Sequence, residues 1–190
     1  MPSAVRPVAL LLFLGALAAP ASAAGPCVSG LKPGQRPGPY SAVVSVGDRR
    51  GQSHCYVCET EDRPAVIVFA RSLSDPLARL VRGLDRAVAG HKGSDLRAWV
   101  TLLHDDQSAF DPQVVAWAKK EAIRHVPLAV FEDVDGPPSY RLSRDADVTV
   151  LLFVKQKVVR NFAFRAGELT GAQVAEVLRA VPEILPAGKK

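Results

Sequence analysis

Several features that define other protein classes are scarce in this sequence. Its 24 lysines and arginines are scattered among 19 acidic residues, and the formal net charge is only +5. No long block of basic residues occurs, so a nucleic-acid-binding surface is not indicated. Internal repeats and low-complexity tracts are also missing. Hydrophobic residues make up 48% and charged residues 23%, a balance that excludes a disordered chain and favours one globular domain.

Long apolar runs are scarce too, and the longest lies near the N-terminus. Residues 8–19 are apolar, follow Arg6, and precede the sequence Ala21-Ser22-Ala23. Such a run is too short for a permanent bilayer-spanning helix, which needs about 20 residues, and the A-x-A pattern is typical of a cleavage site. We therefore predict a signal peptide over residues 1–23 and export to a periplasmic or extracellular location, without a stable membrane span.

Only three cysteines are present, at positions 27, 55 and 58. Outside the cytoplasm, a Cys-x-x-Cys pair such as Cys55 and Cys58 is expected to be oxidised. The odd number leaves Cys27 free or paired with another molecule. The pair alone lacks the further ligands that a zinc site requires. Covalent haem needs a histidine after the pair, whereas His54 precedes it, so no cofactor and no metal ligand is assigned.

The chain is organised around residues 65–70, which read Ala-Val-Ile-Val-Phe-Ala. An apolar run of this length is typical of a strand buried on both faces. The dithiol precedes this strand, and a helix start follows it at Asp75-Pro76, where an aspartate cap meets a proline suited to the first helical position. Asp111-Pro112 repeats this start, and Thr170 with Gln173 has the spacing of a capping box.

These patterns predict an ordered series of elements. Strands are expected over residues 40–46, 52–56, 65–70, 98–103, 128–131, 148–154 and 158–164, and helices over 75–89, from Asp111 to about His125, and from Thr170 onward. Residues 24–39 are dense in glycine and proline and predict an extended arm or tether ahead of a domain spanning residues 40–186. Helices that alternate with buried strands indicate an α/β fold with a sheet covered on both faces. The first two core strands should be adjacent and parallel, and the last two should form an antiparallel hairpin.

Several segments resemble the thioredoxin-like superfamily, in its redoxin and thioredoxin branch. Residues 149–153 (TVLLF), a short turn and Val158-Val159 are similar to the hairpin of that fold, and residues 30–40 are similar to the opening of redoxins. The resemblance covers residues 30–185 by pattern and extends to exported bacterial thioredoxin-like proteins that lack the usual active-site Cys-x-x-Cys. It implies a three-layer α/β sandwich, a mixed central sheet with helices on both faces and an added N-terminal β-hairpin, and thiol–disulfide chemistry.

The sequence departs from the superfamily pattern at two places. In thioredoxins the reactive dithiol follows the first core strand and starts the first helix, and peroxiredoxins hold their reactive cysteine there. Here that stretch, residues 71–75, contains no cysteine. The position of the family's cis-proline is occupied by Val148, which is predicted to be trans because a non-proline cis bond costs about 2.5–4 kcal/mol. Both the reactive group and the substrate-docking edge of the family are therefore altered.

The displaced dithiol carries the functional prediction. Cys55 and Cys58 are the candidate catalytic residues of a weak thiol–disulfide oxidoreductase, with Cys55 attacking and Cys58 resolving. The dithiol should lie at the opposite end of strand 65–70 from the helix start, so its thiolate needs another cation, and His54 and Arg63 are the candidates. The expected partner is a thiol or disulfide protein. Two alternatives stay open: a non-catalytic binding module with a structural disulfide and, more distantly, a zinc-stabilised domain.

Overall fold

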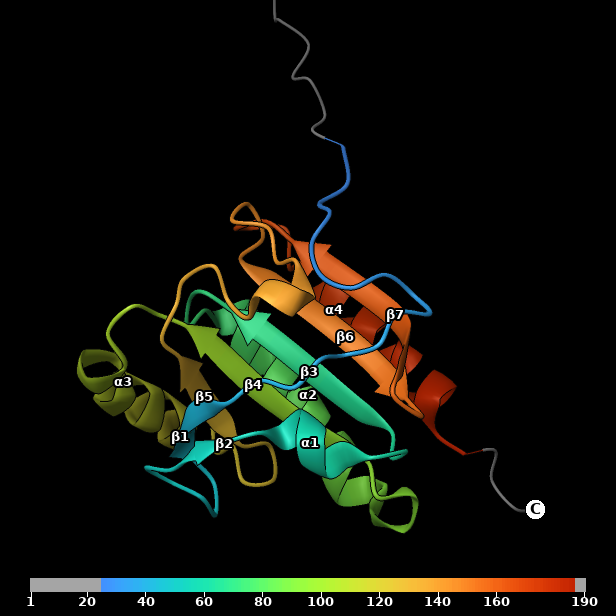
Figure 1. Cartoon of the computed structure of the whole chain (residues 1–190), viewed down its shortest axis with the longest axis horizontal. Coiled ribbons are helices and arrows are strands. Elements are labelled where there is room, and N and C mark those ends of the chain that lie inside the picture. Colours follow the sequence, from blue (N-terminus) through green and yellow to red (C-terminus); the bar gives the residue numbers. More distant parts are fainter. Residues whose placement is uncertain (1–24, 187–190) are drawn as a thin grey trace, which may run out of the picture.

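A single mixed sheet forms the centre of the protein in the computed structural model, which describes residues 25–186 (Figure 1). The signal peptide predicted over residues 1–23 lies outside the described residues. The strands are β1 (Ala42–Val46), β2 (Ser53–His54), β3 (Ala65–Ala70), β4 (Arg97–Leu103), β5 (Leu128–Phe131), β6 (Val148–Val154) and β7 (Lys157–Phe164). The helices are α1 (Tyr56–Thr60), α2 (Asp75–Gly90), α3 (Gln107–Lys120) and α4 (Gly171–Ala180), with short 3-10 turns at Lys92–Ser94, Pro138–Tyr140 and Val181–Ile184. No helix in this part of the chain is both long and apolar enough to cross a membrane.

The seven strands lie in the order β2-β1-β5-β4-β3-β6-β7. β3 has an interior position, parallel to β4 and antiparallel to β6, and Ala65 lies opposite Arg97 at its start. β6 and β7 form the predicted antiparallel hairpin, while the β1–β2 hairpin forms the other edge of the sheet, next to β5. The mixed α/β sheet, with adjacent parallel core strands, is therefore confirmed.

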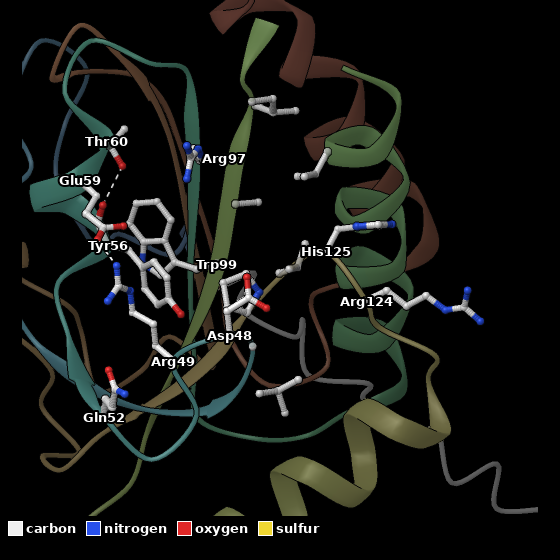
Figure 2. Close-up of a pocket in the computed structure, with 17 residues that line it drawn as sticks. Asp48, Arg49, Gln52, Tyr56, Glu59, Thr60, Arg97, Trp99, Arg124 and His125 are labelled. Carbon is white, nitrogen blue, oxygen red and sulfur yellow. Dashed lines mark hydrogen bonds and ion pairs between the residues drawn. The ribbon is translucent and has the colours of Figure 1, made fainter. Parts of the chain in front are cut away.

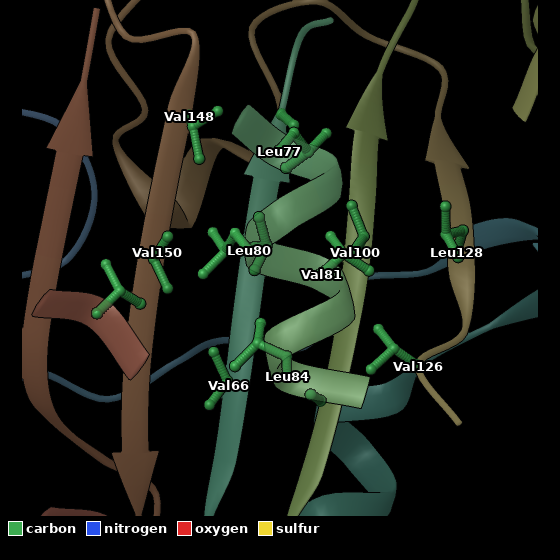
Figure 3. Close-up of a cluster of buried hydrophobic side chains, with 14 of the residues drawn as sticks. Val66, Leu77, Leu80, Val81, Leu84, Val100, Val126, Leu128, Val148 and Val150 are labelled. Atoms are coloured by element: carbon green, nitrogen blue, oxygen red, sulfur yellow. The ribbon is translucent and has the colours of Figure 1, made fainter. Parts of the chain in front are cut away.

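The two faces of β3 belong to two different hydrophobic clusters, because successive strand side chains point to opposite faces. Val66, Val68 and Ala70 face the cluster that includes the apolar stripes of α2, α3 and α4. Figure 3 shows Leu77, Leu80, Val81 and Leu84 of α2 lying over this face of the sheet. Ala65, Ile67 and Phe69 face the opposite cluster. Each of these six strand residues is at most 1% exposed, which explains why the run carries no polar residue.

The predicted caps of α2 and α3 and the predicted start of α3 need correction, because serine and aspartate side chains further upstream act as the caps. α2 is capped by Ser74, whose Oγ accepts a hydrogen bond from the Leu77 N–H at 3.3 Å, so that Asp75 already lies in the first turn. Asp106 caps α3 by accepting from the Ala109 N–H at 2.9 Å. The helix therefore begins well before the predicted start at Asp111, and its proline lies inside it.

Two further helix predictions were also wrong in detail. α3 ends at Lys120 instead of near His125, because Ala122 adopts a left-handed backbone with φ of 54°. α4 starts after Thr170 as predicted, but the Thr170 hydroxyl contacts the Gln173 side chain and makes no hydrogen bond to a backbone N–H. The spacing of a capping box is therefore present without its reciprocal backbone bonds.

The face opposite α2 is covered by α1, by the loop between β5 and β6, and by the glycine- and proline-rich arm that precedes β1 (Figure 1). The arm has no regular structure but is held firmly: the Gly34 N–H donates to the Val158 carbonyl at 2.8 Å, and the Val158 N–H donates to the Gln35 carbonyl at 2.9 Å. Asn161 of β7 adds two bonds, from its side-chain amide to the Ser29 and Leu31 carbonyls at 2.8 and 2.7 Å. The segment is therefore an extended arm packed on the sheet.

Gly30 lies where this arm packs against β6 and β7, and replacing it with alanine should destabilise the fold. Its φ is +85°, and an added Cβ would lie 2.8 Å from Cγ2 of Thr149. Left-handed strain and overpacking together should lower the free energy of unfolding by about 2–4 kcal/mol. Gly34→Ala is the matched control, because its φ is +87° but nothing lies within 4 Å of the added Cβ. That control should lose only about 1 kcal/mol in urea unfolding; equal losses in the two variants would contradict the packing argument.

Candidate functional site

The predicted site residues Cys55 and Cys58 are joined by a disulfide at the start of α1, with their Cα atoms 5.4 Å apart. Cys55 is the N-cap residue, and its Sγ accepts a hydrogen bond from the Cys58 N–H at 3.2 Å. Cys55 is half-buried and Cys58 is exposed. The bonded sulfurs therefore lie at the surface, where a second thiol can approach them.

The helix that carries this disulfide was missed by sequence analysis. α1 has five residues, too few to display a helical repeat of apolar positions. Arg63 holds its C-terminal end by donating to the Thr60 carbonyl at 3.1 Å and to the Glu59 carbonyl. Arg63 also pairs with Asp95 at 3.1 Å. Arg63 is one of the two candidate cations for the thiolate, but its guanidinium is bound to the other end of the helix.

An aromatic contact fastens α1 to the sheet: the Tyr56 ring stacks on Trp99 of β4 with centroids 5.6 Å apart. Within the helix, the Thr60 hydroxyl donates to the Tyr56 carbonyl at 2.8 Å. Burial raises the pKa of Tyr56 to about 12, and the nearby Glu59 carboxylate adds to the shift. Tyr56 is therefore a neutral phenol at physiological pH. Because a helix this short is marginal on its own, these contacts are what hold the dithiol in place.

His54, the other candidate cation, lies against the Tyr56 ring and faces a carboxylate. Its ring meets the Tyr56 ring edge-to-face at 4.5 Å. Its Nε2 lies 3.3 Å from Oε2 of Glu59, and Oε1 of Glu59 is bound by Arg49 at 2.9 Å. A short chain of charged groups thus runs from Arg49 through Glu59 to the residue that precedes Cys55.

A pocket of about 550 Å³ opens beside α1 (Figure 2). Tyr56, Glu59 and Thr60 form its α1 wall, and Figure 2 shows Tyr56 next to Trp99 and Arg49 paired with Glu59. The remaining walls come from the β1–β2 turn, Val88 of α2, the start of β4 and residues 124–127. Carboxylate and guanidinium groups both line the pocket, so its lining carries charges of both signs. Tyr56 and Glu59 link the pocket directly to the helix that carries the dithiol.

The other end of β3, where thioredoxins would carry their dithiol, is closed by hydrogen bonds. The Arg71 guanidinium donates to the carbonyls of Ala146 at 2.9 Å, Ser143 at 3.1 Å and Val134. The Ser72 hydroxyl donates to the Asp147 carboxylate at 3.0 Å. These bonds tie the loop before β6 to the end of β3, a role that no motif in the sequence indicated.

Two further predictions can be compared with the structure. Val148 begins β6 opposite Ala70, and no peptide bond within residues 25–186 is cis, as predicted for this position. Cys27 is a free thiol, and partial burial raises its pKa, although the nearby Arg165 opposes the shift. No group of three or more histidine, cysteine, aspartate or glutamate side chains in the described residues has a geometry suited to a metal ion.

Comparisons with known proteins find a similar backbone architecture only among solved structures. No protein-family model and no curated protein matches the sequence. Among solved structures, a provisionally assigned protein disulfide isomerase from Bacteroides thetaiotaomicron matches with a TM-score of 0.63 and 17% identity, over 84% of this chain and 94% of that protein. A provisionally assigned thiol:disulfide interchange protein DsbE from Chlorobium tepidum matches with a TM-score of 0.58 and 14% identity, over 80% and 99%.

A peroxidoxin, BcpB from Mycobacterium tuberculosis, also matches, with a TM-score of 0.58 and 11% identity over 82% of this chain and 99% of that protein. At such low identities the similarity concerns the backbone architecture alone. Together with the strand order and the mixed sheet, it shows that this chain has the thioredoxin-like fold.

Proposed function

We propose that this protein is an exported thiol–disulfide exchange protein that reacts through Cys55 and Cys58. The observation that carries the proposal is the surface disulfide at the start of α1, in which Sγ of Cys55 already accepts the Cys58 N–H. On reduction the same N–H can donate to a Cys55 thiolate, and hydrogen bonds to charged groups are stronger than those to neutral ones. Cys55 therefore serves as the attacking thiol.

The exchange runs in two displacement steps. The Cys55 thiolate attacks one sulfur of a substrate disulfide, so that a mixed disulfide forms and the other substrate sulfur leaves as a thiolate. The Cys58 thiol loses its proton to solvent and attacks Sγ of Cys55, which releases the second substrate thiolate and re-forms the Cys55–Cys58 bond. The substrate gains two electrons, the protein loses two, and the released thiolates take up protons from water.

The small size of the loop closed by the disulfide supports exchange over a stapling role. The bond joins residues three apart, within the first turn of one helix, and links no separate elements. In the chain-entropy description, closing a loop of this size stabilises a fold by only about 2 kcal/mol. A reactive pair, in contrast, benefits from a small loop at the surface because its resolving thiol stays next to the attacking one.

The partner and location follow from the same reasoning. The partner is a thiol or disulfide protein, and the pocket along Tyr56 and Glu59 offers a place for a peptide segment beside the dithiol. The protein disulfide isomerase and the thiol:disulfide interchange protein among the structural neighbours favour this class of substrate. Export, inferred from the leader-like residues 1–23, puts the pair in an environment where disulfides persist.

An insulin-reduction assay tests the function. All variants carry Cys27→Ser, so that the free thiol cannot contribute. The protein with Cys55 and Cys58 intact should give turnover that is slow but measurable, since a five-residue helix stabilises a thiolate less than a long one. The Cys55→Ser/Cys58→Ser variant should give none. Activity that survives this double substitution would remove both residues from the mechanism.

The same samples decide between exchange and the binding-module alternative. If the intact pair shows no exchange with insulin or with oxidised glutathione, while reduction lowers the melting temperature, then the disulfide is structural. Exchange accompanied by a small change in melting temperature on reduction is the result expected here.

A further inference from the structure

The turn closed by the Cys55–Cys58 disulfide supplies part of the wall of the pocket beside α1. Between the two cysteines lie Tyr56 and Val57, and both pack against the hydrophobic cluster that includes Trp99. Tyr56 also lines the pocket and stacks on Trp99 with ring centroids 5.6 Å apart (Figure 2). The disulfide and this pocket wall therefore belong to the same turn of the chain.

Few other interactions hold that turn in place. No backbone hydrogen bond of residues 25–186 joins α1 to a strand, so side chains fasten the helix to the sheet. Arg63 binds carbonyls at the C-terminal end of the helix only. At the N-terminal end, the Cys58 N–H donates to Sγ of Cys55, which is itself a sulfur of the disulfide. The first turn therefore depends on the disulfide and on the Tyr56–Trp99 stack.

Loss of the disulfide should shift this turn towards an open form. A helix of five residues is marginal by itself, because few hydrogen bonds offset the ordering of its backbone. In the chain-entropy description, a cross-link between residues three apart makes the open form about thirtyfold less populated. Reduction removes this constraint and leaves the stack as the main contact that closes the turn.

We propose that the Cys55–Cys58 bond is a redox switch for this pocket: the oxidised bond holds Tyr56 on Trp99, and reduction opens the first turn of α1 and frees Tyr56 from the wall. In the reduction, a dithiol is oxidised to its own disulfide, the Cys55–Cys58 bond breaks, and the two cysteine sulfurs take up two electrons and two protons. The reduced turn still visits its closed form, in which the Cys58 N–H meets Cys55. The switch goes beyond the proposed exchange, because it needs a reducible pair but no turnover with a protein substrate.

Amide hydrogen exchange followed by mass spectrometry tests the switch, with Cys27→Ser protein compared in its oxidised and reduced forms near neutral pH. Fragments covering residues 55–63 should exchange about thirtyfold faster after reduction, because their exchange rate follows the population of the open turn. Fragments of α2 are the internal control and should exchange equally in both forms, since α2 packs on the opposite face of the sheet. Equal rates for residues 55–63 in the two forms would overturn the proposal. Faster exchange that extends to α2 would also overturn it, because the disulfide would then stabilise the whole fold.

Tyrosine ionisation reports on the pocket wall itself. The sequence has three tyrosines; burial raises the pKa of Tyr56 to about 12 and raises the pKa values of Tyr40 and Tyr140 beyond that. Release of Tyr56 into water should lower its pKa towards the ordinary value of about 10. Reduction should therefore move the first tyrosinate absorbance step to lower pH by at least about one unit, and Tyr56→Phe should remove that step.

A first step at the same pH in the oxidised and reduced proteins would contradict the release of Tyr56 and overturn the switch. Both measurements are independent of the insulin assay. An open turn without insulin turnover would refute exchange but support the switch, whereas turnover with a turn that stays closed would support exchange and refute the switch.

Discussion

Replacing Cys58 with serine in a Cys27→Ser background is expected to trap a mixed disulfide with substrate through Cys55, whereas replacing Cys55 should trap none. The reason is an asymmetry between the two sulfurs. Sγ of Cys55 sits at the helix cap and accepts the Cys58 N–H at 3.2 Å, while no N–H of the described residues is bonded to the sulfur of Cys58. The first thiolate to form should therefore be that of Cys55.

The trapped species can be measured by intact mass after mixing each reduced variant with an excess of a peptide disulfide. Cys58→Ser should gain the mass of one peptide thiol in nearly all molecules, and Cys55→Ser should gain it in few. The exposure of the two residues favours the opposite roles, because Cys58 is exposed whereas Cys55 is half-buried and therefore harder for a substrate to reach. Trapping by Cys55→Ser but not by Cys58→Ser would mean that access dominates thiolate stability, and the roles would then be exchanged.

The central part of the fold is predictable from sequence because each feature there has one physical cause. The run 65–70 has no polar residue, so it must be covered on both faces, and the structure buries each of its side chains. The β6–β7 hairpin follows from two apolar runs and a short turn. Helix starts are harder, because several residues that can cap lie close together: Ser74 competes with Asp75, and Asp106 precedes Asp111.

The candidate site was only half predictable. The Cys-x-x-Cys spacing reveals a dithiol whatever the surrounding structure, and His54 adjoins it in sequence. The rest of the site consists of α1, the Tyr56–Trp99 stack and the His54–Glu59 contact. These features form because the chain turns over the start of β4, and a five-residue helix is too short to leave a sequence pattern from which that turn could be predicted. Arg63 illustrates the same limit: in sequence it looks available to the dithiol, but it binds carbonyls at the far end of the helix.

The arm and the loop before β6 depend in the same way on contacts between distant residues. Gly30 was part of a segment predicted only as an arm or tether, yet it packs against Thr149 of β6. The role of Arg71 could not be predicted either, because its three carbonyl partners lie more than 60 positions further along the chain. Such partners are brought together by the sheet topology, which becomes known only once all strands are placed.

Substitution of Asp85 should produce the largest loss of stability, because its side chain holds the segment that follows α3. Its carboxylate, on α2, is buried, and one oxygen accepts the N–H groups of Arg124 at 3.0 Å, His125 at 2.6 Å and Val126 at 3.0 Å. Asp85→Ala leaves these three donors without a partner, and each such loss in a buried site costs about 1–3 kcal/mol. We expect the free energy of unfolding to fall by about 3–5 kcal/mol.

Two further variants show how much of this stability comes from the charge of Asp85, from its hydrogen-bond acceptor and from its place in α2. Asp85→Asn keeps an oxygen that can accept, and should lose about 1–2 kcal/mol, since hydrogen bonds to neutral groups are weaker. Asp75→Asn removes an exposed carboxylate in the first turn of the same helix and should lose less than about 1 kcal/mol. Guanidinium unfolding followed by far-UV circular dichroism measures all three; an Asp85→Ala loss no larger than that of Asp75→Asn would contradict the three-bond argument. Because residues 124–127 also line the pocket beside α1, a folded Asp85→Asn variant should show any loosening of that wall as slower exchange through Cys55.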